Sequence, residues 1–227
     1  MISLLMIADD FTGALDTGVQ FAASGIETRV VVGADIELAA KADEAQVLVV
    51  DAETRHLAPE QAYRAVEKLT RQAVELGFTY IYKKTDSALR GNIGAELTAL
   101  LRASGEKQLP FLPAYPKVGR TTAGGIHLVD GIPVAESVFG RDPFEPVRHS
   151  GLAEIIGEQS DIAVHTSPAL GPEDPVPGAE GILVFDGESD QDLMATGQRL
   201  LEEGRLHIMA GCAGFGAVLP RLLGLSA

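Results

Sequence analysis

The chain has 227 residues, of which 46% are hydrophobic, and a composition of this kind indicates a globular protein with a large core. The formal net charge of −14 argues against a nucleic-acid or anionic-membrane partner. No apolar run has the length of a membrane span, residues 1–8 lack the features of a signal peptide, and the single cysteine, Cys212, cannot form an intrachain disulfide, so we expect a cytoplasmic location.

The first predicted element is a buried strand at residues 4–8, which ends at Asp9 and Asp10. Thr12 and Gly13 then begin a segment with helical spacing, whose predicted inner face is formed by Leu15, Val19, Ala22 and Ala23. In open α/β sheets, ligands bind where a strand leads into a helix in this way. Capping of the helix by Asp10 or Thr12 would explain the same residues, and both interpretations stay open at this point.

Strands and helices alternate along the next part of the chain. The patterns predict strands at residues 28–32, 47–51, 80–83 and 108–112, and helices at 59–76 and 93–104, the latter capped by Asn92. Further strands are expected at 162–165, 182–186 and 207–210, and a helix with a Ser189–Asp192 capping box at 190–203. This order predicts a single three-layer α/β/α domain over residues 1–227 with a mainly parallel sheet.

Residues 113–150 interrupt the alternation. Segments 126–129 and 132–135 predict a hairpin around Asp130-Gly131, a pair that favours the type I′ turn. Because so long a connection in a compact domain is usually functional, we expect a flap or interaction lobe at the edge of a site. Phe139 and Phe144 are expected to be exposed there and to hint at an interface.

Three loops follow strand ends and meet at one edge if the sheet is parallel: Asp9–Gly13, Lys84–Asn92 and Gly211–Gly216. The second lies in a locally basic segment, since residues 83–120 contain seven basic and three acidic residues. Cations for an acid group, Asp and Asn for hydroxyls, and backbone donors from the glycine-rich loop predict a pocket for a polyhydroxy acid. An aspartate that faces a hydroxyl can also accept its proton during phosphoryl transfer.

Other catalytic motifs do not fit. Gly211–Gly216 is neither a Walker A loop nor a GxGxxG motif, and no histidine or cysteine spacing predicts a metal site. Asp9-Asp10-Phe11-Thr12 only partly matches the Asp-x-Asp-x-Thr nucleophile loop of haloacid-dehalogenase-type phosphatases, because its two aspartates are adjacent.

Several motifs together carry a family resemblance. These are Ala8–Ala14, Lys84–Gly94, Pro113–Pro116 with Gly119–Thr121, Glu136-Ser137, Arg141–Pro143 and Gly211–Gly214. They resemble the N-terminal domain of the four-carbon acid sugar kinases, collinearly over nearly the whole chain. The resemblance implies a protein that binds a small anionic sugar acid, within a family that phosphorylates threonate, erythronate or 3-oxo-tetronate with ATP and Mg²⁺.

The resemblance and the loop argument together predict the site. Asp10 and Asp86 are the predicted catalytic residues. The predicted substrate-binding residues are Asp9, Thr12, Gly13, Lys84, Ser87, Arg90, Gly91, Asn92, Arg120, Gly211 and Gly214. Lys84 and Arg90 are expected to bind the carboxylate of the acid, and Asp9 and Asp10 its hydroxyls or the proton of the attacking one. The helix start at Thr12–Gly13 is expected to face the incoming phosphoryl group.

Family kinases have a C-terminal domain that binds the nucleotide, and the sequence ends at Ala227, where that domain would begin. We therefore do not expect this chain to bind the nucleotide alone, and a separate nucleotide-binding domain or a second copy is the expected protein partner. Two alternatives to the kinase half stay open: a non-catalytic sugar-acid sensor, and a Mg²⁺-dependent phosphatase with Asp9 or Asp10 as its nucleophile.

Overall fold

Short apolar runs form the strands of a central sheet. The computed structural model describes residues 3–41 and 45–225, and in it eight strands lie in the order β2-β3-β1-β4-β11-β5-β10-β9 with every pairing parallel. Their bounds are β1 (Leu4–Ala8), β2 (Thr28–Val32), β3 (Val47–Asp51), β4 (Tyr80–Lys84), β5 (Gln108–Leu112), β9 (Val164–Ser167), β10 (Gly181–Phe185) and β11 (Ile208–Gly211). The predicted parallel α/β class is confirmed.

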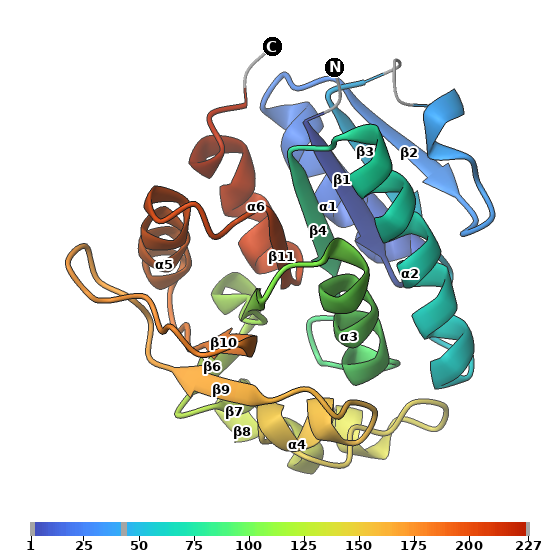
Figure 1. Cartoon of the computed structure of the whole chain (residues 1–227). Coiled ribbons are helices and arrows are strands. Elements are labelled where there is room, and N and C mark those ends of the chain that lie inside the picture. The colour runs from blue at the N-terminus through green and yellow to red at the C-terminus, as the bar shows by residue number, and fades with distance from the viewer. Residues whose placement is uncertain (1–2, 42–44, 226–227) are drawn as a thin grey trace.

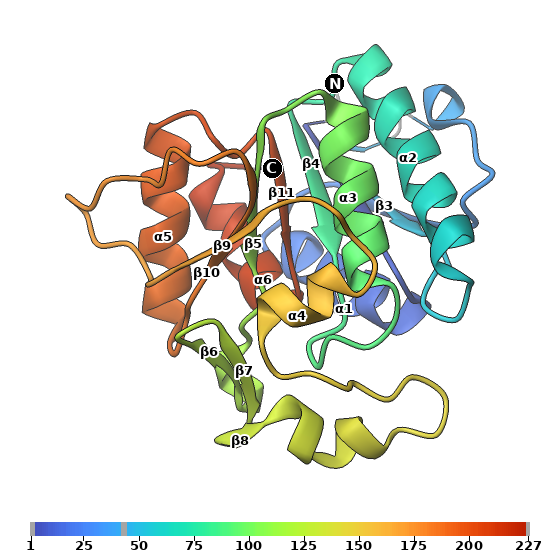
Figure 2. The ribbon, with the colours of Figure 1, turned by 60° about the horizontal axis from the view of Figure 1, so that its bottom comes forward.

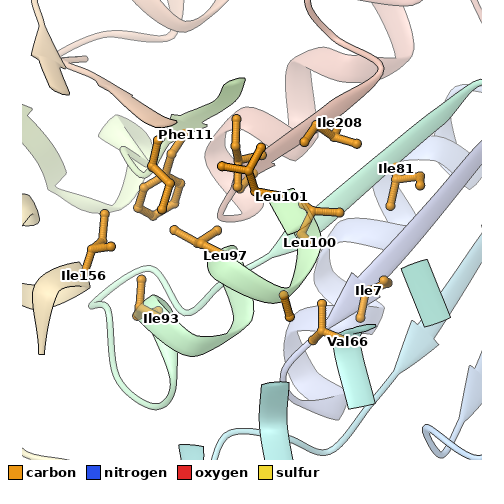
Figure 3. Close-up of a cluster of buried hydrophobic side chains, with 14 of the residues drawn as sticks. Ile7, Val66, Ile81, Ile93, Leu97, Leu100, Leu101, Phe111, Ile156 and Ile208 are labelled. Carbon is orange, nitrogen blue, oxygen red and sulfur yellow. The ribbon is translucent and has the colours of Figure 1, made fainter. Parts of the chain in front are cut away.

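Helices cover both faces of this sheet, because successive side chains of each buried strand point to opposite sides. One face packs against α2 (Pro59–Leu76), α3 (Ile93–Ser104) and α4 (Leu152–Gly157), and the other against α1 (Phe11–Ala23), α5 (Asp190–Glu202) and α6 (Ala213–Leu222). In β1, Leu5 and Ile7 belong to the first core, and Leu4 and Met6 to the second. Figure 1 shows α2 and α3 in front of the sheet, and Figure 3 shows their side of the core.

The predicted inner face of α1 is wrong. Leu15 and Val19 are 44% and 57% exposed, and the helix instead buries Gly13, Ala14, Thr17, Gly18 and Phe21. Gly18 brings α1 close to the sheet, since a Cβ there would lie 3.4 Å from Val30. Both faces of α1 carry apolar residues, so periodicity alone could not select the one with the closer approach.

The strand order creates a crevice between β1 and β4. These neighbours are followed by α1 and α3, which lie on opposite faces of the sheet. Adjacent strands of this kind form a topological switch point, where ligands bind at the carboxyl edge. Ala8 is in register with Lys84, so Asp9 and Asp10 after β1 and Asp86 after β4 reach the same crevice.

A second, antiparallel sheet lies in the interrupting segment, with β6 (Arg120–Ala123), β7 (Ile126–Val129) and β8 (Ile132–Pro133). Asp130 and Gly131 have φ of 52° and 78°, as the predicted type I′ turn requires. The hairpin is therefore present, although its second strand ends at Pro133. We call residues 113–150 the lobe; Figure 2 shows β6–β8 at the end of the sheet toward which β4 runs.

Short 3₁₀ helices complete the described elements: η1 (Leu38–Ala40), and within the lobe η2 (Pro116–Val118), η3 (Val134–Glu136) and η4 (Val138–Arg141). Phe144 is 82% exposed as expected, whereas Phe139 is half-buried, so the expected exposure of Phe139 is wrong. None of the helices in the described ranges has the length and apolar character that crossing a bilayer requires.

The contact between α3 and α4 depends on Gly94. A Cβ at this position would lie 2.2 Å from the backbone oxygen of Ile156, which cannot rotate away. We expect Gly94→Ala to lower the free energy of unfolding by about 1–3 kcal/mol, measured by urea denaturation. Gly157→Ala in α4 is the control, because a Cβ there would meet nothing within 4 Å. Equal stability of the two variants would contradict the packing argument.

Candidate functional site

A cavity of about 130 Å³ lies at the crevice between β1 and β4. Its walls come from the first turns of α1 and α6, the loops after β3 and β4, and the start of the lobe. The lining residues are Asp10, Thr12, Gly13, Asp16, Arg55, Lys84, Asp86, Ser87, Arg90, Tyr115 and Ala213. Seven predicted site residues are therefore brought together here, namely Asp10, Thr12, Gly13, Lys84, Asp86, Ser87 and Arg90.

Arg55 joins the predicted acidic residues and was not among the predicted site residues. Its Nε donates to Asp9 Oδ2 at 2.8 Å, its Nη1 donates to Asp10 Oδ2 at 2.7 Å, and its Nη2 lies 3.6 Å from Asp86 Oδ1. One guanidinium thereby pairs with carboxylates from two different loops. The signal that would have found it is its position in the loop after β3, which ends beside β1 at the same edge.

The loop that carries Arg55 is held by residues of the β4–α3 segment. Asn92 Nδ2 donates to the carbonyl oxygens of Thr54 and Leu57 at 2.9 and 2.8 Å, and the Thr54 hydroxyl donates to Glu96. Asn92 is the residue before α3, but its side chain does not cap that helix, so the predicted capping role is wrong. Buried Asn92 does not line the cavity; it positions the loop of Arg55.

Asp10 serves both as a helix cap and as a member of the site. Its Oδ1 accepts a hydrogen bond from the Gly13 amide at 3.0 Å, while Oδ2 binds Arg55. The two interpretations of this turn are therefore compatible. Asp9 is 2% exposed, does not line this cavity, and is bound to Arg55.

Asp86 organises Arg90. The carboxylate accepts hydrogen bonds from Arg90 Nε at 2.8 Å and Nη2 at 3.0 Å, and from the backbone amides of Ala88 and Arg90. Burial by itself would raise the pKa of Asp86, but the hydrogen bonds from Arg90 and the charge of Arg55 outweigh it and lower the pKa to about 2. Asp86 is thus a charged anchor for Arg90.

The lobe packs on the loop after β4 through His127, Phe139 and Asp142. The His127 Nε2 donates to the Ser87 backbone oxygen at 2.9 Å, and its Nδ1 accepts from the Thr122 hydroxyl at 3.1 Å; the tautomer follows because a carbonyl oxygen only accepts. The guanidinium carbon of Arg90 lies 5.2 Å from the centre of the Phe139 ring, within the range of a cation–π contact.

Six predicted site residues do not line the cavity: Asp9 and Asn92, described above, and Gly91, Arg120, Gly211 and Gly214. The guanidinium carbon of Arg120 lies 5.3 Å from the centre of the same Phe139 ring that Arg90 contacts. Arg120 does not line the cavity. Gly211 is buried against the end of β5, where its Cβ would lie 2.5 Å from the oxygen of Leu112, and Gly214 against the segment after β5, where its Cβ would lie 2.2 Å from the oxygen of Ala114. These glycines permit close backbone packing, and Ala213 between them lines the cavity.

Gly91 also lies outside the cavity. It has a φ of +86°, and a Cβ there would meet the backbone of Arg55 at 3.2 Å. Its role in the structure is therefore to let the two loops of the site approach each other.

Removal of the Arg55 charge should destabilise the fold, because it leaves buried Asp9 without its partner. We expect Arg55→Met to lower the free energy of unfolding at pH 7 by about 3 kcal/mol in urea denaturation. Arg64→Met is the matched control, since the side chain of Arg64 is 72% exposed and pairs with Glu60 on the surface of α2. Similar losses in both variants would contradict the central role of Arg55.

Burial lowers the pKa of His127 from 6.5 to about 4. Between these pH values the unfolded chain binds a proton at this residue that the folded chain does not, so stability falls as the pH drops. We expect about 3 kcal/mol of the loss in unfolding free energy between pH 6.5 and 4 to disappear in His127→Gln. His165→Gln, at an exposed position, should keep the wild-type slope. An unchanged slope in His127→Gln would contradict this assignment.

Comparisons with known proteins show which family the chain resembles. Residues 4–219 match a family model described as a sugar-binding N-terminal domain. The chain is 38% identical over 230 residues to a D-threonate kinase of Salmonella typhimurium, which covers 96% of this chain and 53% of that protein. It is 28% identical to a 3-oxo-tetronate kinase of Methylobacterium radiotolerans, covering 98% and 55%. The chain thus spans about half the length of the curated relatives it matches.

A solved structure shows the same fold. A domain of unknown function from Bordetella bronchiseptica, crystallised as a domain-swapped dimer with bound citrate, superposes with a TM-score of 0.87 at 31% identity, covering 97% of this chain and 56% of that one. The match of the family model over nearly all of the chain, together with these kinases, decides the family. The chain belongs to the four-carbon acid sugar kinase family and corresponds to its N-terminal sugar-binding domain.

Proposed function

We propose that this domain binds a four-carbon acid sugar (threonate, erythronate or 3-oxo-tetronate) in the cavity between β1 and β4, as the sugar-binding half of an ATP-dependent kinase. One observation carries the proposal: the cavity at the switch point combines carboxylates, a hydroxyl and cations in about 130 Å³, the size of a small polar ligand. The relatives named as kinases of these acids support it. Citrate, bound by the Bordetella bronchiseptica protein, is itself a hydroxy acid.

Arg90 is the proposed partner of the carboxylate of the acid. Its Nε and Nη2 are engaged by Asp86, but Nη1 has only a long contact of 3.4 Å with Asp142. The guanidinium is 28% exposed and lines the cavity beside Ser87. A carboxylate can therefore bind Nη1 without displacing Asp86.

Asp10 is the proposed base, in preference to Asp86. Asp10 is 25% exposed and lines the cavity, and each of its oxygens accepts one hydrogen bond, whereas the Asp86 carboxylate accepts four hydrogen bonds from Arg90 and backbone amides. The hydroxyl oxygen of the acid forms a bond to the terminal phosphorus of ATP while the bond from that phosphorus to its bridging oxygen breaks. The hydroxyl proton passes to Asp10.

ATP and Mg²⁺ are proposed to be held mainly by another domain. The sequence has no phosphate-binding loop, and the described residues contain no group of three His, Cys, Asp or Glu side chains arranged to hold a metal ion. The proposal therefore assigns nucleotide and magnesium binding mainly to residues outside this domain. The domain that supplies them is the proposed partner, and a homodimer is a second proposed assembly, as in the Bordetella bronchiseptica structure.

The two alternatives are less well supported. The phosphatase alternative needs Asp9 or Asp10 as its nucleophile, but Asp9 is 2% exposed and the relatives are named as kinases. A sensor without catalysis would use the same cavity, but the relatives are named as kinases. The cytoplasmic location remains part of the proposal, on the basis of the single cysteine.

The proposal is tested by calorimetry of the chain with threonate, erythronate and 3-oxo-tetronate. We expect one of these acids to bind, and Arg90→Ala to weaken that binding about tenfold or more, because a charge-assisted hydrogen bond is lost. Arg102→Ala, which removes an exposed contact with Asp161, should leave the affinity unchanged. Absence of binding for all three acids, or wild-type affinity in Arg90→Ala, would overturn the proposal.

A further inference from the structure

Lys84 carries a buried charge that the described part of the protein leaves without a hydrogen-bond acceptor. Its side chain is 5% exposed, and the nearest carboxylate oxygen, Asp9 Oδ1, lies 3.9 Å from Nζ. Asp9 is meanwhile bound to Arg55 through its other oxygen. None of the three donors of this ammonium has a hydrogen-bond acceptor among the described residues, so the position is suited to an acceptor that arrives with a ligand. The cavity is where that acceptor would be, since Lys84 lines it.

The ammonium lies directly against the first turn of α1. A Cβ on Gly13 would come within 2.1 Å of Lys84 Nζ and 2.6 Å of Asp10 Oδ1, so glycine is what allows these two groups to approach the helix start. Lys84 and the proposed base Asp10 are therefore neighbours. A group transferred to a hydroxyl of the bound acid at Asp10 would therefore lie beside Lys84.

The start of α1 adds backbone donors to the same place. The first four amides of a helix have no acceptor inside it. Those of Gly13 and Ala14 are used by the side chain and carbonyl of Asp10, which leaves the amides of Phe11 and Thr12. α1 has 13 residues, and the N-terminus of such a helix favours an anion.

We infer that Lys84 and the first turn of α1 form the subsite for the phosphoryl group that is transferred to the sugar acid. Lys84 binds the phosphate of the phosphorylated product, and Arg90 binds the carboxylate. This inference rests on the proposed function, and it replaces the role expected for Lys84 from sequence. In the transition state the ammonium offsets the negative charge on the phosphoryl oxygens, beside the base that receives the proton.

Other charges in the cavity make Lys84 decisive for an anion. Asp10 and Asp16 line the same cavity, and either carboxylate repels a phosphate. Of the cations on the wall, Arg55 and Arg90 are paired with Asp9, Asp10 and Asp86. Without the ammonium of Lys84, the cations left on the wall would be Arg55 and Arg90, which are already paired with carboxylates.

The test compares two ligands by calorimetry: the four-carbon acid that the chain binds, and the phosphate monoester of that acid. Lys84→Met should weaken binding of the ester about tenfold or more and that of the acid less than about threefold, because only the ester has a phosphate. Lys107→Met is the control, since Lys107 is exposed, pairs with Glu180 and lies at the start of β5, at the opposite edge of the sheet. It should change neither affinity.

Thermal unfolding provides a second measurement that needs no sugar acid. Inorganic phosphate should raise the melting temperature of the wild type and not that of Lys84→Met, because the variant lacks the ammonium that binds the phosphate. Equal losses for acid and ester would show that Lys84 binds the carboxylate and would overturn the inference, as would unchanged binding of the ester. If the wild type binds neither acid nor ester, the proposed function itself fails.

Discussion

The site depends on one guanidinium that three carboxylates share. Arg55 binds Asp9 and Asp10 after β1 and approaches Asp86 after β4, so it offsets charges that would otherwise repel one another at the switch point. The contacts also join loops that are far apart in sequence. Because the ion pairs are largely buried, they are directional and weakly screened, and they fix the geometry of the crevice before a ligand arrives.

The cations that line the cavity, Arg55, Lys84 and Arg90, differ in how they are paired. Arg55 is committed to the aspartates, and Arg90 is mostly committed to Asp86. Lys84 has no such hydrogen-bonded partner in the described ranges, and it lies where a helix begins. An acidic protein can in this way hold an anionic ligand: most of its local positive charge serves the structure, and one ammonium stays available beside the backbone donors of α1.

The lobe belongs to the site although it interrupts the fold. His127 reaches from β7 to the backbone of Ser87, and Phe139 covers Arg90. The neutral imidazole is well suited to this position because a buried charge would be costly there, and burial accordingly lowers the pKa of His127 to about 4. The loop after β4 is thus supported from two sides, by the lobe and by the Arg55 ion pairs.

The sequence by itself determined the parallel α/β class, the strand-end loops and most of the cavity wall, because apolar runs and turn residues act locally. The sequence alone did not identify Arg55 as a residue of the site. It also did not reveal that Asn92 holds the loop of Arg55 or that Gly214 permits close backbone packing. Those roles arise from contacts between segments distant in the chain. The buried face of α1 was likewise decided by how closely Gly18 approaches the sheet. Only the tertiary structure decided which charges are paired and which ammonium has no hydrogen-bonded acceptor among the described residues, because pairing depends on distances that strand order sets.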